Sequence, residues 1–192
     1  MSSSAVRTRR FSRLEYERLI DLEIFPPGER VELVGGQLVV REPQGSPHMT
    51  AIGLADDALR VAFGPGWIVR TQGPLVVDDE SEPEPDVVVV RGTRRDYASG
   101  HPTEPALVIE VAESSLTLDR EQKGSLYARA RVADYWIVNL VDRVLEVYRD
   151  PAPAAEALYG WRYCTAETLG ADAFISPLAA PWSRILVADL LP

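Results

Sequence analysis

The hydrophobic and polar positions at the start of the chain predict a helix followed by a β-hairpin. Apolar residues recur at helical spacing over residues 12–22, behind a Ser12-Arg13-Leu14-Glu15 segment that has the form of a capping box. Two β-rich runs follow at 31–34 and 37–40, and Gly35-Gly36 joins them. Two such runs separated by two glycines are typical of a tight hairpin.

The rest of the pattern predicts a mixed α/β (α+β) protein with much antiparallel pairing. We expect helices within 49–62 and 117–131, and strands at 67–71, 75–77, 87–90, 106–111, 134–140, 144–148, 161–165 and 185–191. The runs 87–90 and 106–111 are almost continuously apolar, which is typical of strands covered on both faces. The acidic, proline-interrupted residues 78–86 predict a solvated loop, and the Pro- and Ala-rich residues 150–156 are the one candidate linker.

Length and composition restrict the class of protein. The 192 residues are 46% hydrophobic, as in an ordinary soluble globular protein, and predict a single domain over residues 11–192. Residues 1–10, rich in Ser and Arg, predict a short disordered leader. No apolar run reaches the ~20 residues of a membrane helix, so we expect no membrane partner. The single cysteine, Cys164, excludes an internal disulfide and is consistent with a cytoplasmic location.

The charged residues restrict the partners and the metals. A net charge of −9 opposes nucleic-acid binding unless the basic groups cluster locally. One cysteine and two histidines, His48 and His101, exclude a structural zinc site of the Cys/His type. Any bound metal would therefore be a hard cation such as magnesium, manganese or calcium, held mainly by carboxylates.

Two carboxylates are expected to face each other across the apolar strands. If the loop 91–105 joins the two strands symmetrically, Val88 lies opposite Val108 and Asp86 lies opposite Glu110. Directly opposed side chains have Cβ atoms roughly 4.5–5.5 Å apart, and two carboxylates at that distance repel unless a cation lies between them. A divalent metal is one such cation; the alternative is an Asp at the surface and a Glu satisfied by an Arg.

Lys123 is the only lysine among 20 basic residues, the other 19 being arginines. On the expected helix it shares a stripe with Tyr127, with Asp119 one turn before it, and that stripe would face the sheet. A lone lysine favours a position where a compact ammonium is needed rather than a guanidinium fork. The alternative is a surface pair with Asp119, worth a few tenths of a kcal/mol.

These residues resemble the core of the PD-(D/E)XK nucleases and, more closely, the bacterial Uma-type restriction endonuclease family, formerly a domain of unknown function. No single motif is diagnostic, but the series runs in order over about residues 11–192. The matching segments are RVELVGGQL (30–38), His48, PEPDVV (83–88), LVIEV (107–111), Ser114-Ser115, Asp119, Lys123, Tyr127, DYWIV (134–138) and ISPL (175–178).

The resemblance implies a restriction-endonuclease-like αβββαβ core, extended by the N-terminal helix and β-hairpin and by extra C-terminal strands. It also implies a metal, Mg²⁺ or Mn²⁺, at Asp86 and Glu110. The superfamily usually carries its lysine two residues after the strand acid, where this chain has Ala112. The family pattern implies that the lysine has moved to the following helix, from which Lys123 would reach back into the site.

The resemblance assigns further side chains to the same site. Glu32 matches a family glutamate before the Gly-Gly turn and would complete the acidic cluster; the alternative is an exposed hairpin residue opposite Arg41. Asp119 would fix the lysine in place. His48, at a helix start, would touch a phosphate or transfer a proton, although most lone histidines do neither.

The implied activity is metal-dependent hydrolysis of nucleic-acid phosphodiester bonds, in DNA rather than RNA, giving a 5′-phosphate and a 3′-hydroxyl. In that mechanism Lys123 would orient the attacking water or stabilise charge on the phosphoryl oxygens. The net charge and Ala112 leave a second class open, a catalytically inactive nucleic-acid-binding module on the same fold. A third class is an interaction protein whose acidic residues 78–86 contact a basic partner.

A nuclease requires basic and aromatic groups that contact the nucleic acid. The best candidates, Arg91, Arg94 and Arg95, lie in the loop 91–105 with Tyr97 and His101 as stacking residues, although a solvated loop is the more common explanation of each. Arg129 and Arg131 are the next candidates. We also expect a homodimer, because twofold dimers are the commonest oligomers.

Overall fold

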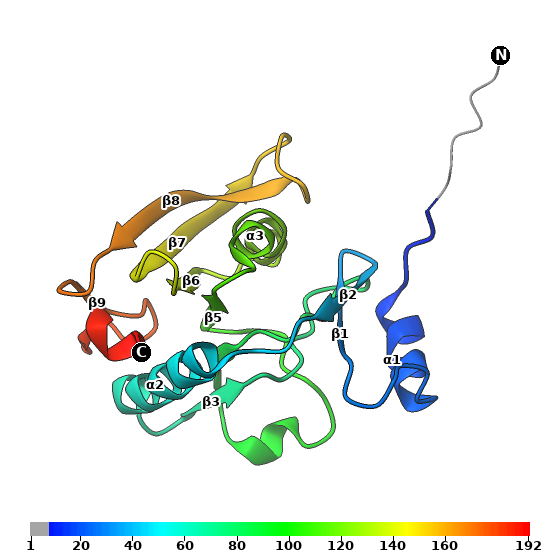
Figure 1. Ribbon diagram of the computed structural model, residues 1–192, viewed down its shortest axis with the longest axis horizontal. Helices are drawn as coiled ribbons and strands as arrows, with labels where there is room; N and C mark the ends of the chain where they lie inside the picture. The colour runs from blue at the N-terminus through cyan, green and yellow to red at the C-terminus, as the bar shows by residue number, and fades with distance from the viewer. Residues whose placement is uncertain (1–7) are drawn as a thin grey trace.

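A six-stranded mixed sheet forms the centre of the computed structural model, which describes residues 8–192 (Figure 1). The strand order is β3-β4-β5-β6-β7-β8, and every neighbouring pair is antiparallel except the parallel pair β5–β6. The strands are β3 (Trp67–Thr71), β4 (Val87–Arg91), β5 (Leu107–Ala112), β6 (Asp134–Asn139), β7 (Val144–Pro153) and β8 (Trp161–Leu169). The mixed α/β class is therefore confirmed.

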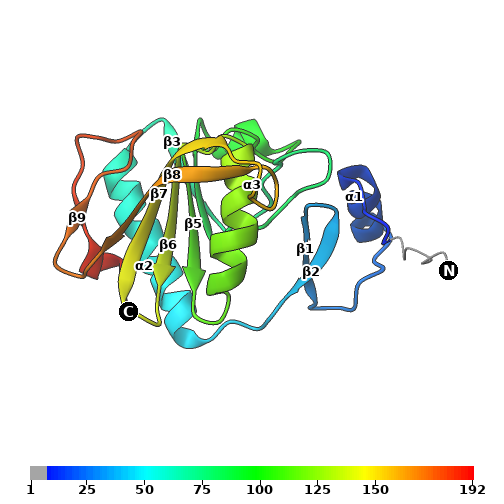
Figure 2. The same ribbon diagram turned by 90° about the horizontal axis from the view of Figure 1, so that it is seen from above.

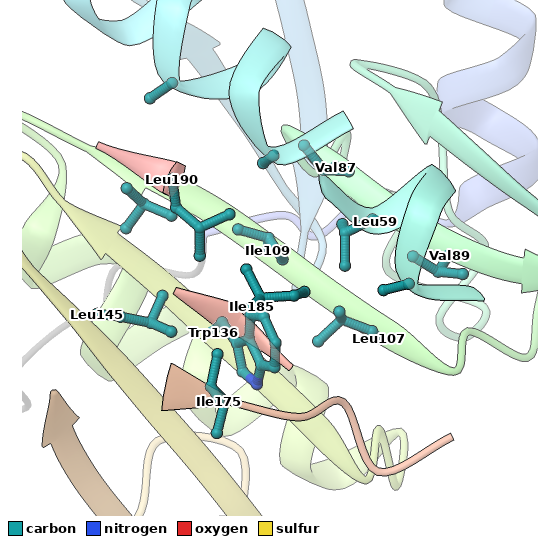
Figure 3. Close-up of a cluster of buried hydrophobic side chains, with 14 of the residues drawn as sticks. Leu59, Val87, Val89, Leu107, Ile109, Trp136, Leu145, Ile175, Ile185 and Leu190 are labelled. Carbon is teal, nitrogen blue, oxygen red and sulfur yellow. The ribbon is translucent and has the colours of Figure 1, made fainter. Parts of the chain in front are cut away.

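Helices cover the two faces of this sheet, as the continuously apolar runs predict. On one face α2 (Ser46–Phe63) packs against alternate residues of β4 and β5, and α3 (Gly124–Arg129) lies on the other face. Figure 3 shows Leu59 of α2 with the residues it joins, labelled Val87, Val89, Leu107, Ile109 and Trp136. Because each such side chain stabilises the fold by about 1.5–3 kcal/mol when buried, this core fixes the register of the central strands.

The N-terminal helix and hairpin form a separate unit at one end of the molecule, seen best in Figure 2. The unit contains α1 (Arg13–Asp21), β1 (Arg30–Val34) and β2 (Gln37–Arg41), with its own small core around Tyr16 and Leu33. The capping box of α1 is confirmed, since Ser12 and Glu15 bond reciprocally. The predicted helix and hairpin are both present.

The predicted leader, residues 1–10, lies mostly outside the described part of the chain, which begins at residue 8. Arg10 is already attached to the domain by an ion pair with Glu80 at 3.4 Å, and the Phe11 N–H donates to the carbonyl of Gly36 at 2.9 Å. Contacts with the rest of the domain therefore begin before residue 11.

Two predictions about the middle of the chain are wrong. Residues 75–77 form no strand, because the N–H groups of Leu75 and Val76 bond to the carbonyls of Pro83 and Pro102 rather than to a strand of the sheet. Residues 78–86 are not a solvated loop: Ser81 and Glu82 are buried, and Glu82 exchanges backbone hydrogen bonds with Leu33 of β1. The acidic segment is therefore a structural connection between the hairpin and the sheet.

The predicted linker 150–156 is also wrong, because β7 runs on to Pro153 and pairs there with β8. The prolines are tolerated because the first residue of β6, Asp134, lies opposite Arg149, so β7 pairs only with β8 beyond Arg149. The predicted C-terminal strand is short: β10 (Ile185–Leu186) pairs with β9 (Phe174–Ile175) before a 3₁₀ turn. Among residues 8–192, no helix has the length and apolarity needed to cross a membrane.

Candidate active site

The strands β4 and β5 pair in the register expected from the sequence. Val88 lies opposite Val108, and Asp86 directly precedes β4. One carboxylate oxygen of Asp86, Oδ2, accepts a hydrogen bond of 2.9 Å from the Val111 N–H on β5. Because Glu110 is the residue before Val111, this register brings both buried carboxylates to the same end of the sheet.

Lys123 joins two of the acids in the interior. Its Nζ lies 3.1 Å from Oε1 of Glu110 and 3.1 Å from Oε1 of Glu32, and the residue is 2% exposed. The hydroxyl of Tyr127 donates to the same oxygen of Glu110 at 2.8 Å. The structure therefore brings together the three residues Glu32, Glu110 and Lys123 that the sequence assigned to one site.

Glu32 is a buried member of this cluster and not an exposed hairpin residue. It lies opposite Val39 rather than Arg41 and is 1% exposed. Its second oxygen accepts a hydrogen bond of 2.9 Å from the Glu84 N–H, which fixes the carboxylate relative to the segment leading to Asp86. The hairpin thus contributes a side chain to a site built mainly on the sheet.

The lysine reaches the sheet from an unusual helix. The expected helix 117–131 consists of a π-helical segment, Leu118–Lys123, continued by α3. The wider π turn leaves both Asp119 and Lys123 on the buried side. Segments of π-helix occur frequently at functional sites, and here the segment lies in the crossover between the parallel strands β5 and β6.

Asp119 is buried beside the cluster but does not hold the lysine directly. No ion pair within 4 Å joins it to Lys123, both of which lie in the described part of the chain. Its side chain accepts a hydrogen bond of 2.5 Å from the Ser115 hydroxyl, and its carbonyl accepts one from Tyr135. The structure therefore does not show the direct contact expected of it.

Asp86 is held by polar side chains from the hairpin end and the start of α2. Arg41 donates to its Oδ1 at 2.7 Å, and Gln44 donates to the same oxygen at 3.2 Å. Nε2 of His48 lies 3.2 Å from Oδ2, so the predicted histidine is at the site. From the sequence, Arg41 is expected only opposite Glu32 at the surface, and Gln44 is not identified. A buried Asp86 requires hydrogen-bond donors, and this requirement was the one signal that pointed to such residues.

The surroundings set the protonation of these groups. Burial raises the pKa of Glu110, while the charge of Lys123 opposes that rise. Burial would also raise the pKa of Asp86, but the adjacent His48 and the charge of Arg41 hold this pKa well below its usual range. For Lys123, burial is outweighed by Glu110 and Glu32, which keep the pKa above its ordinary value. Asp86 is thus firmly ionised, and the amine of Lys123 is firmly protonated.

These side chains line a cavity of about 300 Å³ that opens between the hairpin, the start of α2 and the π-helical segment. Acidic side chains in its lining outnumber those of Arg and Lys, so the cavity favours a cation. Its ionisable residues are Glu32, Arg41, Glu42, His48, Asp86, Glu110, Glu113, Asp119 and Lys123.

A magnesium-like cation fits this donor set. Within residues 8–192, no three His, Cys, Asp or Glu side chains converge into a ready-made cluster. Mg²⁺ does not need one, because it keeps several waters and is commonly bound by one or two carboxylates. Asp86 and Glu110 supply two carboxylates at a cavity large enough for a hydrated ion.

The structure does not bring the predicted nucleic-acid-binding arginines to this cavity. Asp86 precedes β4 and Arg91 ends it, which separates them by about 17 Å at 3.3 Å per residue. The Arg91 guanidinium lies over the ring of Trp67 at 4.3 Å, and Arg94 and Arg95 follow in a 3₁₀ turn. These arginines therefore lie at the opposite end of the strand.

Comparison with known proteins decides the family. A family model described as "Uma2: Putative restriction endonuclease" matches residues 14–187, nearly the whole chain. The chain belongs to this family. The Uma2 match confirms the resemblance drawn from the ordered motifs.

A solved structure supports the fold of this Uma2-family chain. It is described as "a putative nuclease belonging to DUF820 from Anabaena variabilis ATCC 29413" and superposes with a TM-score of 0.65 at 15% identity. The match covers 90% of this chain and 96% of that chain. The restriction-endonuclease-like fold is thereby confirmed. A comparison with curated proteins finds no match.

Proposed function

We propose that this Uma2-family protein is a metal-dependent endonuclease that hydrolyses phosphodiester bonds in nucleic acid, in DNA rather than RNA. The observation that carries the proposal is the buried ammonium of Lys123, held 3.1 Å from both Glu32 and Glu110 at a cavity that Asp86 also lines. The description of the family and that of the Anabaena protein, a nuclease, support the reaction class.

In this proposal Asp86 and Glu110 would hold Mg²⁺ or Mn²⁺, with Glu32 close by. When bound, such a metal polarises a phosphoryl oxygen and lowers the pKa of a bound water. Arg41, Gln44 and the Val111 N–H orient the Asp86 carboxylate, and Tyr127 orients that of Glu110. A carboxylate held in this way does not need to reorganise when a ligand arrives.

Lys123 supplies a fixed positive charge to the reacting phosphate. Its ammonium is excluded from bulk water, and in such a site an oriented donor stabilises developing charge far better than in solution. Glu32 and Glu110 hold the ammonium in place from two sides. His48, 3.2 Å from Asp86, lies at the cavity wall, where it is available to contact a phosphate oxygen.

Cleavage assays with variants test the proposal. Labelled duplex DNA, single-stranded DNA and RNA are incubated with the purified protein in Mg²⁺, in Mn²⁺ and in EDTA. We expect metal-dependent cleavage of DNA that is lost in Asp86→Asn, Glu110→Gln and Lys123→Met, and retained in Glu121→Gln. Glu121 is an exposed carboxylate on the same π-helical segment and serves as the matched control. Undiminished cleavage by Asp86→Asn would contradict the proposal.

A second function is supported by the cations already within the site. Arg41 pairs with Asp86 at 2.7 Å, and Ala112 stands where the superfamily usually has its lysine. Both observations suit a nucleic-acid-binding or protein-interaction module that does not cleave. Binding assays with the same labelled nucleic acids in EDTA, run beside the cleavage assays, separate the functions. A nucleic-acid-binding module would bind equally well in the wild type and in Glu110→Gln and cleave in neither, and a protein-interaction module would neither bind nor cleave nucleic acid.

We also propose that the protein is a twofold homodimer that works in the cytoplasm. Twofold dimers are the commonest assemblies of soluble proteins, and the single Cys164 is free. Light scattering coupled to size-exclusion chromatography tests the assembly, and a monomeric mass at micromolar concentration would contradict it.

A further inference from the structure

Arginines without an ion-pair partner gather at the edge strand β3. Most arginines in residues 8–192 lie within 4 Å of a carboxylate. Arg70 on β3, Arg91 at the end of β4 and the neighbouring Arg94 and Arg95 have no such partner among those residues. On a chain of net charge −9, uncompensated arginines at one place form a local positive surface.

Part of this surface is hollowed. Arg60, Arg70 and Arg94 line a cavity of about 320 Å³ along the outer side of β3, and no acidic residue contributes to its lining. Because β3 is the edge strand of the sheet, no further strand covers that side. The cavity therefore offers guanidinium groups and exposed strand backbone to a ligand from solution.

The side chains of this cavity are held in place without being fully satisfied. Asp56 binds Arg60 through two hydrogen bonds of 2.8 and 2.7 Å, and Arg60 also donates to the Val69 carbonyl at 3.2 Å. The Arg70 guanidinium lies over the ring of Tyr97 at 5.6 Å, and its buried Nε has no hydrogen-bond partner. A buried donor without a partner is costly, so a ligand that accepts from it is favoured.

The acid nearest in sequence to Arg94 and Arg95 does not neutralise them. Asp96 accepts a hydrogen bond of 2.7 Å from the Thr93 N–H and so caps its own 3₁₀ turn. No ion pair within 4 Å joins Asp96 to either arginine. Their charges stay available to an anion.

The edge strand connects this cavity to the candidate active site. β3 leads into Gln72, whose N–H donates to the Asp86 carbonyl at 3.0 Å and whose amide donates to Gln44. Helix α2 runs alongside β3 (Figure 1). On this helix His48 lines the active-site cavity, and Arg60, twelve residues or about 18 Å further along, lines the arginine cavity. Arg70 lies nearer to the active site, because it pairs with Val88, two residues beyond Asp86.

We propose that the cavity of Arg60, Arg70 and Arg94 is a phosphate-binding site that holds the nucleic-acid backbone within about five base pairs, or 18 Å, of the bond being cleaved. This inference rests on the proposed function, because it takes nucleic acid as the substrate. A guanidinium presents a planar fork of donors that matches two phosphate oxygens, and such charge-assisted bonds are strong. The site thus gives an acidic protein a defined place to bind a polyanion.

Fluorescence anisotropy with a labelled DNA duplex tests the site, measured in EDTA so that no cleavage occurs. The test variant is Arg70→Gln with Arg94→Gln. The matched control is Arg18→Gln with Arg184→Gln, which removes two other arginines without ion pairs, from α1 and from the C-terminal region. Both double variants change the net charge equally, so a difference between them reports position rather than total charge.

We expect the test variant to bind the duplex at least about 10-fold more weakly than the wild type, and the slope of log affinity against log salt to fall by about 2. The control variant should bind almost as the wild type does. Equal weakening in both variants, or none in either, would overturn the inference. Arg94→Gln alone is the second variant, because Arg94 is exposed and its replacement leaves the fold intact. It should show about half of the change in slope.

Two further measurements separate the possible outcomes. Calorimetric titration with inorganic phosphate shows whether the cavity binds a free anion. If the wild type binds phosphate but not the duplex, and the test variant loses the phosphate binding, the site is retained but assigned to free phosphate. Absence of both kinds of binding would overturn it. A wild type that binds duplex through these arginines yet cleaves nothing in Mg²⁺ or Mn²⁺ would refute the nuclease and leave this site standing.

Discussion

At the scale of single residues, the site depends on one ammonium between two carboxylates. Lys123 is fully enclosed, and Glu32 and Glu110 each lie 3.1 Å from its Nζ. Removing one member of a buried ion pair typically costs about 3–5 kcal/mol, because the remaining charge is left unpaired in a poorly solvated place. The lysine is therefore a structural requirement as well as a candidate catalytic group.

We predict that Lys123→Met lowers the free energy of unfolding by about 3–5 kcal/mol, as measured by urea denaturation. Adding Glu32→Gln to that variant should restore part of the loss, since it removes one of the two stranded carboxylates. A wild-type urea midpoint for Lys123→Met would show that the ammonium does not hold the carboxylates together.

At the scale of elements, the hairpin positions Glu32 and Arg41, and its turn has little freedom. Gly35 and Gly36 have φ angles of +55° and +78°, in the region that favours glycine. A Cβ at Gly36 would lie 2.7 Å from Cβ of Arg10. The two glycines therefore set the geometry that brings the hairpin side chains to the sheet.

We predict that Gly36→Ala destabilises the protein by at least about 1–2 kcal/mol, the usual cost of a left-handed conformation for a residue with a Cβ. Gly53→Ala is the control: it lies within α2, nothing stands within 4 Å of its added Cβ, and it should stabilise by up to about 1 kcal/mol. Thermal unfolding of both variants measures the difference. Equal shifts would contradict the assigned turn geometry.

The segment between hairpin and sheet makes stability depend on pH. Burial, reinforced by the charge of Glu17, raises the pKa of Glu82 from its usual 4.5 to about 7. The folded state then holds a proton that the unfolded state releases, so stability falls as pH rises from about 4.5 to about 7. Glu82→Gln should remove this part of the pH dependence.

Urea midpoints at pH 5 and pH 8 measure that effect. We expect the wild type to lose more stability than Glu82→Gln between the two values. A variant with the same loss as the wild type would show that Glu82 is not the group responsible.

Much of the element order could be predicted, because local signals agree with the tertiary structure. The capping box, the Gly-Gly hairpin and the β4–β5 register are examples. Residues 75–77 and 78–86 could not be assigned correctly, because their backbone bonds to residues distant in sequence such as Leu33 and Pro102. Arg41 was missed for a related reason: its partner Asp86 lies 45 residues away.

At the scale of the whole molecule, three separate units meet at one cavity. The sheet provides Asp86 and Glu110, the β5–β6 crossover provides Lys123, and the hairpin provides Glu32. A second cavity, lined by Arg60, Arg70 and Arg94, lies along the edge strand β3. The fold thus separates a cation-favouring site from a positive surface on a chain that is acidic as a whole.

Calorimetric titration of Mn²⁺ into the wild type and into Asp86→Asn tests the central claim, that the buried carboxylates form a metal site, most directly. We predict that the wild type binds a divalent ion, with or without a DNA oligonucleotide, and that Asp86→Asn does not, while circular dichroism shows both to be folded. A wild type that binds no metal even with the oligonucleotide present, or an Asp86→Asn variant that binds it equally well, would contradict the account.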